Sequence, residues 1–262
     1  MQSAGRDAAG GAEPAGRRQR SDAGSTRLGP RDVQAIMWLE DMRAISEPDL
    51  AVLLGRLSNP PRGPLSPGAA AAVLARWRRH HLAQARRIYV NTPSYVWLTA
   101  EGARLAGAGQ WTEPGWSALP HAAAVARTRL WLEGSPADRF RAESWLSERR
   151  FRAERVPLQR PGESVLVPDA EITCGDGVTA AVEVELSAKS PNRTLAKVLR
   201  LTGPAYDRVI YVVPADTLTE RVVRTAVAEA ADRQMSSVLG VRPATEKILF
   251  ASLPAAGLGP GS

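Results

Sequence analysis

The chain has 262 residues, 44% of them hydrophobic, which is enough apolar material for two small domains or one large one. Its formal net charge is +7, and it contains one cysteine, Cys174, and three histidines. These counts exclude an internal disulfide framework and a zinc cluster. No apolar run approaches the length of a membrane helix, and the arginine-containing N-terminus has no hydrophobic signal region. We therefore expect a cytoplasmic protein that does not bind a membrane.

The two ends of the chain are expected to be flexible. Residues 1–28 are rich in Gly, Ala, Ser and Arg and contain almost no large apolar residue. Burial of such a segment cannot offset the entropy lost when it becomes ordered. Residues 254–262 have a similar composition. The sequence thus predicts a disordered basic tail before residue 29 and a flexible tail after residue 253.

Three helices are predicted at the start of the folded part. Apolar residues recur at helical spacing through residues 33–45. Ser46 and Ser66 then each precede a proline near the start of another helix, and the second of these extends to His81. These helices are expected to begin a domain that spans residues 29–106.

Positive charge is concentrated between Leu50 and Ala100. This window contains no Asp or Glu but has seven arginines: Arg56, Arg62, Arg76, Arg78, Arg79, Arg86 and Arg87. A concentrated basic segment is typical of a protein that binds the phosphate backbone of nucleic acid. The alternative is a small helical protein-interaction domain whose arginines form a solvated face.

Two strand-like runs, "ARRIYV" and "YVWLT", follow the third helix and are joined by the turn-rich "NTPS". Thr99 then caps one more short helix. This order of elements over residues 31–106 resembles a winged helix-turn-helix domain, in which the third helix enters the major groove. The resemblance implies a recognition helix at Ser66–His81 and a wing at Ala85–Trp97. It implies DNA contacts from Arg76, Arg78, Arg79, His80, Arg86 and Arg87.

A second domain is predicted at residues 120–253, after a Gly- and Pro-containing linker at 107–119. His121 opens a helix that ends at Gly134, and the following residues change from helical to alternating periodicity near Phe151. The expected elements after the first helix are a helix at 137–150, strands at 151–158, 164–174 and 178–187, a helix at 192–201, a strand at 207–214, a helix at 216–240 and a strand at 247–253. The fold class is therefore α+β or α/β.

Acidic residues occupy facing positions in the second and third of these strands. Glu183 and Glu185 alternate with valines, so they point to one face of their strand. The "GDG" sequence favours a tight hairpin turn. If this turn centres on Asp176, Asp169 lies seven residues before the centre and Glu183 seven residues after it. We expect the two carboxylates to face each other across the hairpin.

Two interpretations of these carboxylates remain open. A Mg²⁺ ion between them would remove their repulsion, activate a water molecule and stabilise charge on a phosphodiester. Lys189 could then supply a further positive charge at the phosphate. Alternatively, the acids form the solvated face of an antiparallel hairpin, which is the commoner reason for such alternation.

The pattern of Pro168-Asp169 followed by Glu183-Val184-Glu185 resembles the PD-(D/E)xK nuclease-like fold, also called restriction-endonuclease-like. The resemblance implies a mixed sheet in which Asp169 and Glu183 bind Mg²⁺. It also implies catalytic roles for these two acids and for Glu185 and Lys189.

This chain departs from that pattern at one position. Glu185 stands where lysine is usual, and Lys189 follows four residues later. The departure weakens the expectation of cleavage more than the expectation of the fold. An acid from the preceding helix often joins such sites, and Glu143 and Glu148 are the matching candidates.

The two halves together are similar to the replication-relaxation family of bacterial proteins, which are linked to plasmid replication and conjugative elements. The similarity rests on "HAAAVARTRL", "WLSER", "VPDA" and "VEVE" after a winged helix, over about residues 30–215. It implies DNA as a partner, together with other replication or relaxosome proteins. Two functions follow from it, a metal-dependent DNA nuclease and a non-enzymatic regulator or relaxosome accessory with a degenerate scaffold. A protein-binding adaptor is a third alternative.

Overall fold

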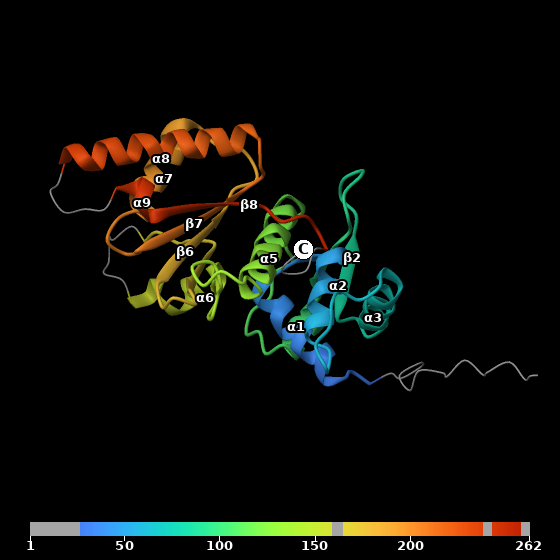
Figure 1. Ribbon diagram of the computed structural model, residues 1–262. Coiled ribbons are helices and arrows are strands. Elements are labelled where there is room, and N and C mark those ends of the chain that lie inside the picture. The colour runs from blue at the N-terminus through green and yellow to red at the C-terminus, as the bar shows by residue number, and fades with distance from the viewer. Residues whose placement is uncertain (1–26, 159–164, 238–242, 258–262) are drawn as a thin grey trace, which may run out of the picture.

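The computed structural model describes residues 27–158, 165–237 and 243–257, which form helices around two sheets (Figure 1). This arrangement confirms the mixed α+β class that the sequence predicts. In the described part of the chain, no helix has the length and apolar character needed to cross a membrane. Residues 1–26 of the tail predicted at 1–28 lie outside the described parts, as do the last five residues. Leu28, within that predicted tail, packs against the apolar core.

The N-terminal unit contains a three-stranded antiparallel sheet with the order β1-β3-β2. Helices α1, α2 and α3 precede the β2–β3 hairpin, and α4 follows it. The elements are α1 (Pro30–Met42), β1 (Ile45–Ser46), α2 (Glu47–Arg56), α3 (Pro67–Arg79), β2 (Ala83–Arg86), β3 (Tyr95–Leu98) and α4 (Ala100–Leu105).

Local sequence signals explain where these helices begin. The side chains of Ser46, Ser66 and Thr99 each accept a hydrogen bond from a backbone N–H in the first turn, at 3.2–3.3 Å. Such caps satisfy donors that have no partner inside the helix. Gly102 allows α4 to approach the β2 side of the sheet, because a Cβ atom there would lie 2.0 Å from the carbonyl oxygen of Leu82.

The second sheet has five strands in the order β4-β5-β6-β7-β8. Strands β4 to β6 pair antiparallel, whereas β6, β7 and β8 pair parallel. The elements are α5 (Leu119–Glu133), β4 (Leu146–Ser147), α6 (Glu148–Glu154), β5 (Ala170–Thr173), β6 (Thr179–Val184), α7 (Pro191–Leu201), β7 (Arg208–Val213), α8 (Leu218–Ser237), α9 (Ala244–Lys247) and β8 (Ile248–Ser252).

Strand β6 lies at the centre of this sheet and is buried on both faces. Val182 and Val184 belong to the apolar cluster that includes α5. Ala181, one position along, belongs to a second cluster formed by α7, α8 and β7. The interpretation of the hairpin acids as a solvated face is therefore wrong for Glu183, of which 1% is exposed.

The segment between α5 and β5 differs from the prediction. Of the helix expected at 137–150, residues 137–147 form non-helical chain and β4, and residues 148–150 begin α6. The strand expected at 151–158 is replaced by the rest of α6 and a short 3₁₀ turn. The pairing of β4 with β5 interrupts the helical periodicity of residues 137–150. Ser147 then caps α6, which buries Phe151. Tertiary pairing and capping thus override the local periodicity.

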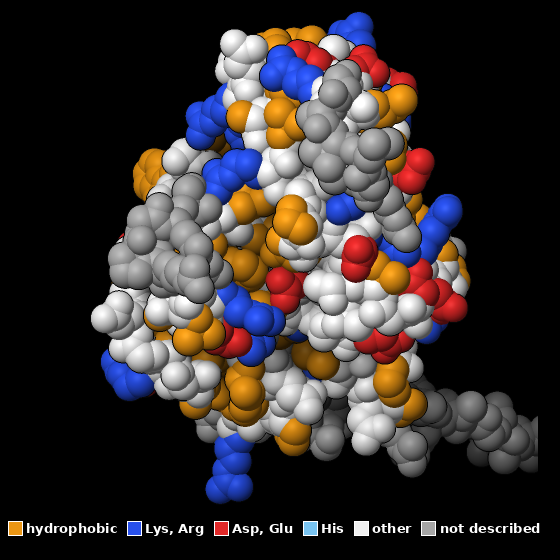
Figure 2. All heavy atoms as spheres, turned by 90° about the vertical axis from the view of Figure 1, so that its left-hand side faces the viewer, with side chains coloured by type: hydrophobic (Ala, Val, Ile, Leu, Met, Phe, Trp, Pro, Cys, Tyr) orange, Lys and Arg blue, Asp and Glu red, His pale blue; other side chains and the backbone are white. Residues whose placement is uncertain are grey.

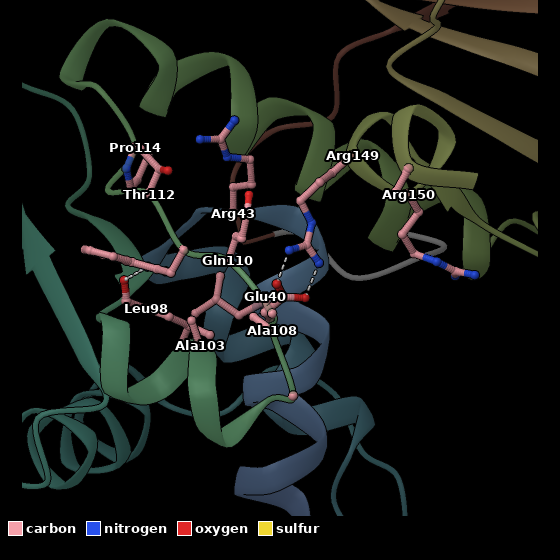
Figure 3. Close-up of a pocket in the computed structure, with 15 residues that line it drawn as sticks. Glu40, Arg43, Leu98, Ala103, Ala108, Gln110, Thr112, Pro114, Arg149 and Arg150 are labelled. Carbon is pink, nitrogen blue, oxygen red and sulfur yellow. Dashed lines mark hydrogen bonds and ion pairs between the residues drawn. The ribbon is translucent and has the colours of Figure 1, made fainter. Parts of the chain in front are cut away.

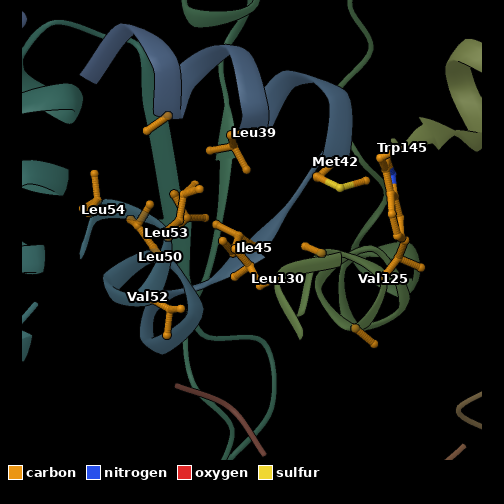
Figure 4. Close-up of a cluster of buried hydrophobic side chains, with 14 of the residues drawn as sticks. Leu39, Met42, Ile45, Leu50, Val52, Leu53, Leu54, Val125, Leu130 and Trp145 are labelled. Carbon is orange, nitrogen blue, oxygen red and sulfur yellow. The ribbon is translucent and has the colours of Figure 1, made fainter. Parts of the chain in front are cut away.

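Helix α5 contacts both sheets and lies between them (Figure 1). One apolar cluster continues from α1 and α2 through α5 to β6 and β7. Figure 4 shows part of it, with Leu39, Ile45 and Leu130 close together and Trp145 beside Val125. The predicted linker at 107–119 contains a 3₁₀ turn and the start of α5.

The chain returns to the N-terminal unit after β8. The N–H of Gly257 donates a hydrogen bond to Oδ1 of Asp49 (2.9 Å), at the start of α2. The guanidinium of Arg127 donates both to Oδ2 of Asp49 (3.0 Å) and to the carbonyl oxygen of Pro254 (3.3 Å). Residues 254–257, which the sequence assigns to a flexible tail, are thus hydrogen-bonded to α2 and α5.

Candidate functional site

The β5–β6 hairpin brings Asp169 and Glu183 opposite each other. Ala170 pairs with Val182, so Asp169 and Glu183 form the next pair beyond the end of β5. The N–H of Val184 donates a hydrogen bond to Oδ2 of Asp169 at 2.8 Å. This register is the one expected for a turn centred on Asp176.

Glu183 is a buried acid with one free oxygen. Its Oε2 accepts a hydrogen bond from Nζ of Lys197 on α7. Its Oε1 is buried and has no hydrogen-bond partner among the described residues. Burial, and then the negative charge of Asp169, raise the pKa of Glu183 to about 8, although the ammonium of Lys197 acts in the opposite direction.

Asp169 is held by His121, which lies in the first turn of α5. Nε2 of the imidazole lies 3.0 Å from Oδ1 of the carboxylate. Burial acts to raise the pKa of Asp169, but the hydrogen bond and charge of His121 and the charge of Lys197 outweigh it, so this pKa is lowered. The hydrogen bond to Asp169 raises the pKa of His121. The pair therefore favours a carboxylate facing an imidazolium.

Glu185 and Lys189 form their own ion pair just after β6, with Nζ 2.5 Å from Oε2. They border the site without contacting its two facing carboxylates directly. The charge of Glu185 contributes to raising the pKa of His121 and of Lys197. The positive charge that the sequence assigns to Lys189 is instead provided, in contact with Glu183, by Lys197.

Lys197 and the contact of His121 with Asp169 were missed by the sequence analysis, which treated His121 as a helix-start residue. Lys197 has one recognisable signal. It occurs at helical spacing from Thr194 and Leu201, which are buried on the face of α7 that covers the sheet. A lysine on such a face needs a nearby acid.

The residues around Asp169 fit a two-carboxylate magnesium site. Mg²⁺ takes one or two carboxylates and completes its shell with water and phosphate oxygens. The unpartnered Oε1 of Glu183 provides a ligand atom that the fold leaves without another role. Among the described residues, no three His, Cys, Asp or Glu side chains are grouped so as to hold a metal. Any ion would therefore depend on two protein ligands.

Of the two further acids considered, only Glu148 approaches this site. Its N–H donates to the carbonyl oxygen of Asp169 (3.1 Å), and both residues line a cavity of about 200 Å³. Its carboxylate is paired with Arg152 at 2.8 Å. Glu143 pairs with Arg141 and does not line this cavity.

The arginines of α3 differ in their surroundings. Arg78 and Arg79 are exposed at the end of the helix, whereas only 12% of the Arg76 side chain is exposed. Its guanidinium donates to both carboxylate oxygens of Asp32, at 2.7 and 2.8 Å. Asp32 also accepts from the indole of Trp77 (3.1 Å). The phosphate contact predicted for Arg76 would require this buried pair to break.

The other predicted DNA-binding residues lie near the hairpin. Arg86 and Arg87 are exposed, and His80 is partly exposed. The guanidinium of Arg86 lies 4.3 Å from the ring centroid of Trp116, which is itself 54% exposed. These side chains extend the positive charge of Arg78 and Arg79 from α3 onto β2.

At the opposite end of the molecule, the described side chains visible in Figure 2 do not form a continuous basic surface. Figure 2 shows the end where α8 and α9 lie. Lys and Arg side chains are interspersed there with Asp and Glu, around a hollow lined by hydrophobic side chains. Charge of one sign is therefore not gathered on the visible part of this face.

Comparisons of the chain with families of known proteins, with curated proteins and with solved structures found no match.

Proposed function

We propose that this chain is a DNA-binding protein of plasmid or mobile-element replication or conjugative transfer. In this proposal, residues 29–106 form a winged helix-turn-helix and the five-stranded sheet belongs to a restriction-endonuclease-like domain that acts as a metal-dependent DNA nuclease. The observation that carries it is the pair of Asp169 and Glu183, with the buried, unpartnered Oε1 of Glu183.

The N-terminal unit supports DNA binding through its order of elements and its charge. Three helices precede an antiparallel hairpin that pairs with β1, and α3 ends in the exposed Arg78 and Arg79. The exposed residues earlier on α3 have small, apolar side chains or none: Pro67, Gly68, Ala71, Ala72 and Ala75. Such side chains cannot hydrogen-bond to base edges, so we expect contacts with phosphate to dominate and sequence preference to be weak.

The five-stranded sheet supports a nuclease-like site through the positions of three side chains. Asp169 directly precedes β5 and Glu183 is next to the last residue of β6, so the two lie at the same edge of the sheet. Lys197 brings an ammonium to the same place from α7. Lys197 thereby replaces the positive charge that is missing at Glu185. A bound Mg²⁺ would activate water and stabilise charge on the phosphodiester. Asp169 and Glu183 would hold it, and Lys197 would add positive charge beside it.

Isothermal titration with Mn²⁺ tests this proposal. Wild-type protein is expected to bind the ion, and Asp169→Asn and Glu183→Gln are each expected to lose that binding, because each removes one of two anionic ligands. Glu229→Gln is the control, since Glu229 is an exposed acid of α8 that pairs with Arg233. Equal Mn²⁺ binding by wild type and both site variants would show that the acids hold no metal. Relaxation of supercoiled plasmid then tests cleavage by the same proteins.

A non-enzymatic regulator or relaxosome accessory is favoured by a different observation. Every acid of the site already has a partner within the protein: Asp169 has His121, Glu183 has Lys197 and Glu185 has Lys189. Paired charges of this kind can stabilise a scaffold without a metal. This function predicts salt-sensitive DNA binding without cleavage under any divalent ion.

A further inference from the structure

Two adjoining cavities form a groove that leads to Asp169. The larger cavity, of about 560 Å³, lies between the end of α1, residues 107–114 and α6 (Figure 3). The smaller, of about 200 Å³, has Asp169 and His121 in its wall. Both are lined by Arg43, Pro114 and Arg149. The groove therefore connects the N-terminal unit with the candidate metal site.

Arg43 is the arginine of this groove that has no ion pair within the described residues. Arg149 pairs with Glu40, Arg150 with Glu154 at 2.9 Å, and Arg152 with Glu148 at 2.8 Å. In Figure 3 the guanidinium of Arg43 points away from the Arg149–Glu40 pair. Arg43 is exposed and lines both cavities, so its charge is available to an anion in the groove.

The backbone of Arg43 has an unfavourable conformation. It follows the last residue of α1 with φ +67°, a region where Gly is the usual residue. A side chain with a Cβ atom is disfavoured in this conformation. Glycine at this position would relieve the strain, so the backbone conformation alone does not favour an arginine here.

Trp111 provides an aromatic surface in the wall of the larger cavity. It is 38% exposed, and its indole N–H donates to the carbonyl oxygen of Leu98 at 3.2 Å, which fixes the ring. Gly107 and Gly109 also line this cavity and add no side chain to it. Trp111 and Arg43 thus line the same cavity. A fixed, exposed aromatic ring and an available cation in one cavity are the combination used to bind unpaired bases and their phosphates.

We propose that this groove binds single-stranded DNA, with a phosphate at Arg43 and a base stacked on Trp111, and leads the strand toward Asp169. A duplex does not fit this chemistry, because its bases are stacked inside and cannot reach the indole ring. The choice of DNA rests on the proposed function. Binding of the strand itself does not need a metal at Asp169 and Glu183.

Fluorescence anisotropy with a labelled oligothymidylate, without added metal, tests the groove. We expect Trp111→Ala to weaken strand binding at least fivefold, because stacking of one base is lost. Arg43→Gly is expected to weaken it severalfold and to lower the salt dependence by about 0.7 in the logarithmic slope. The same Arg43→Gly protein should have a higher melting temperature than wild type, so weaker binding cannot result from loss of the fold.

Arg104→Ala is the matched control, since it removes one exposed arginine of α4 that pairs with Glu101 outside the groove. The control is expected to bind the strand like wild type. Strand binding that is unchanged in Arg43→Gly and Trp111→Ala would overturn the proposal, as would an equal loss in Arg104→Ala. If the protein binds the strand through these residues but binds no Mn²⁺, the metal site is refuted and the proposal for the groove is not.

Discussion

Glu183 lies in an environment that opposes its own ionisation. It is buried on a central strand, opposite the ionised Asp169, and one of its oxygens has no hydrogen-bond partner among the described residues. Lys197 reduces this penalty without removing it, because the pKa of Glu183 remains raised to about 8. A divalent ion would supply the missing partner for Oε1. The buried acid thus has an energetic reason to bind a cation.

The raised pKa of Glu183 predicts how stability depends on pH. Between its ordinary value of 4.5 and about 8, the folded protein keeps a proton that the unfolded chain releases. Stability therefore falls as the pH rises through this window, by up to about 1.4 kcal/mol for each pH unit. Glu183→Gln should remove this contribution. The free energy of unfolding of the variant minus that of wild type should therefore increase from pH 5 to pH 8. Urea denaturation at several pH values measures the difference.

Because His121 also makes stability depend on pH, the free energy of unfolding of Glu183→Gln must be compared with that of wild type at each pH. The pKa of His121 is raised by Asp169, so its contribution to stability is complete below its unfolded pKa and is lost as the pH rises through the folded pKa. Wild type and Glu183→Gln share this contribution. If their stabilities run parallel between pH 5 and pH 8, Glu183 is ionised throughout and the raised pKa is wrong.

Helix α3 shows that neighbouring arginines on one element can have unrelated roles. Arg76 faces inward and links α3 to Asp32 of α1, whereas Arg78 and Arg79 face solvent. Helical spacing separates the two classes, since Arg76 lies beside the buried Trp77 and one turn after Val73. Charge counting over the window of residues 50–100 cannot distinguish a phosphate contact from an internal ion pair.

This difference predicts opposite results for two variants of α3. Arg78→Ala/Arg79→Ala should leave the melting temperature nearly unchanged and lower the affinity for duplex DNA, with a salt slope reduced by about 1.8. Arg76→Ala should destabilise the protein by about 2 kcal/mol, because it leaves Asp32 buried without its main partner. Anisotropy with a duplex and thermal denaturation measure both effects. Duplex affinity that is equal in wild type and the double variant would remove α3 from the proposed interface.

The elements also show what the sequence could and could not predict. The caps at Ser46, Ser66 and Thr99 and the turn at Asp176 are local signals, and the helices and the β5–β6 register that follow from them are confirmed. Segment 137–158 was mispredicted because β4 forms by pairing with a strand that lies more than twenty residues later. Lys197 was missed for a related reason, since its contact with Glu183 depends on how α7 crosses the sheet.

At the scale of the whole molecule, α5 joins the two sheets through charge as well as apolar packing. Arg129 donates to Asp41 of α1 at 2.8 Å and to Glu133 at 2.6 Å. Its guanidinium also lies 5.1 Å from the ring centroid of Trp38 and 5.6 Å from that of Trp145. Because a single apolar cluster surrounds these contacts, the two sheets are expected to lose their structure together.

Equilibrium unfolding tests this coupling. All seven tryptophans lie between residues 38 and 145, so none of them belongs to β5, β6, β7 or β8, whereas far-UV circular dichroism reports on the entire chain. The two signals should give one coincident transition in urea. Arg129→Met should shift both equally, by about 2 kcal/mol, because it leaves Asp41 without its partner and removes the contacts with two aromatic rings. Arg233→Met, which removes an exposed pair on α8, should shift neither. Two separate transitions, or a shift confined to the fluorescence signal, would show that the sheets unfold independently despite their shared core.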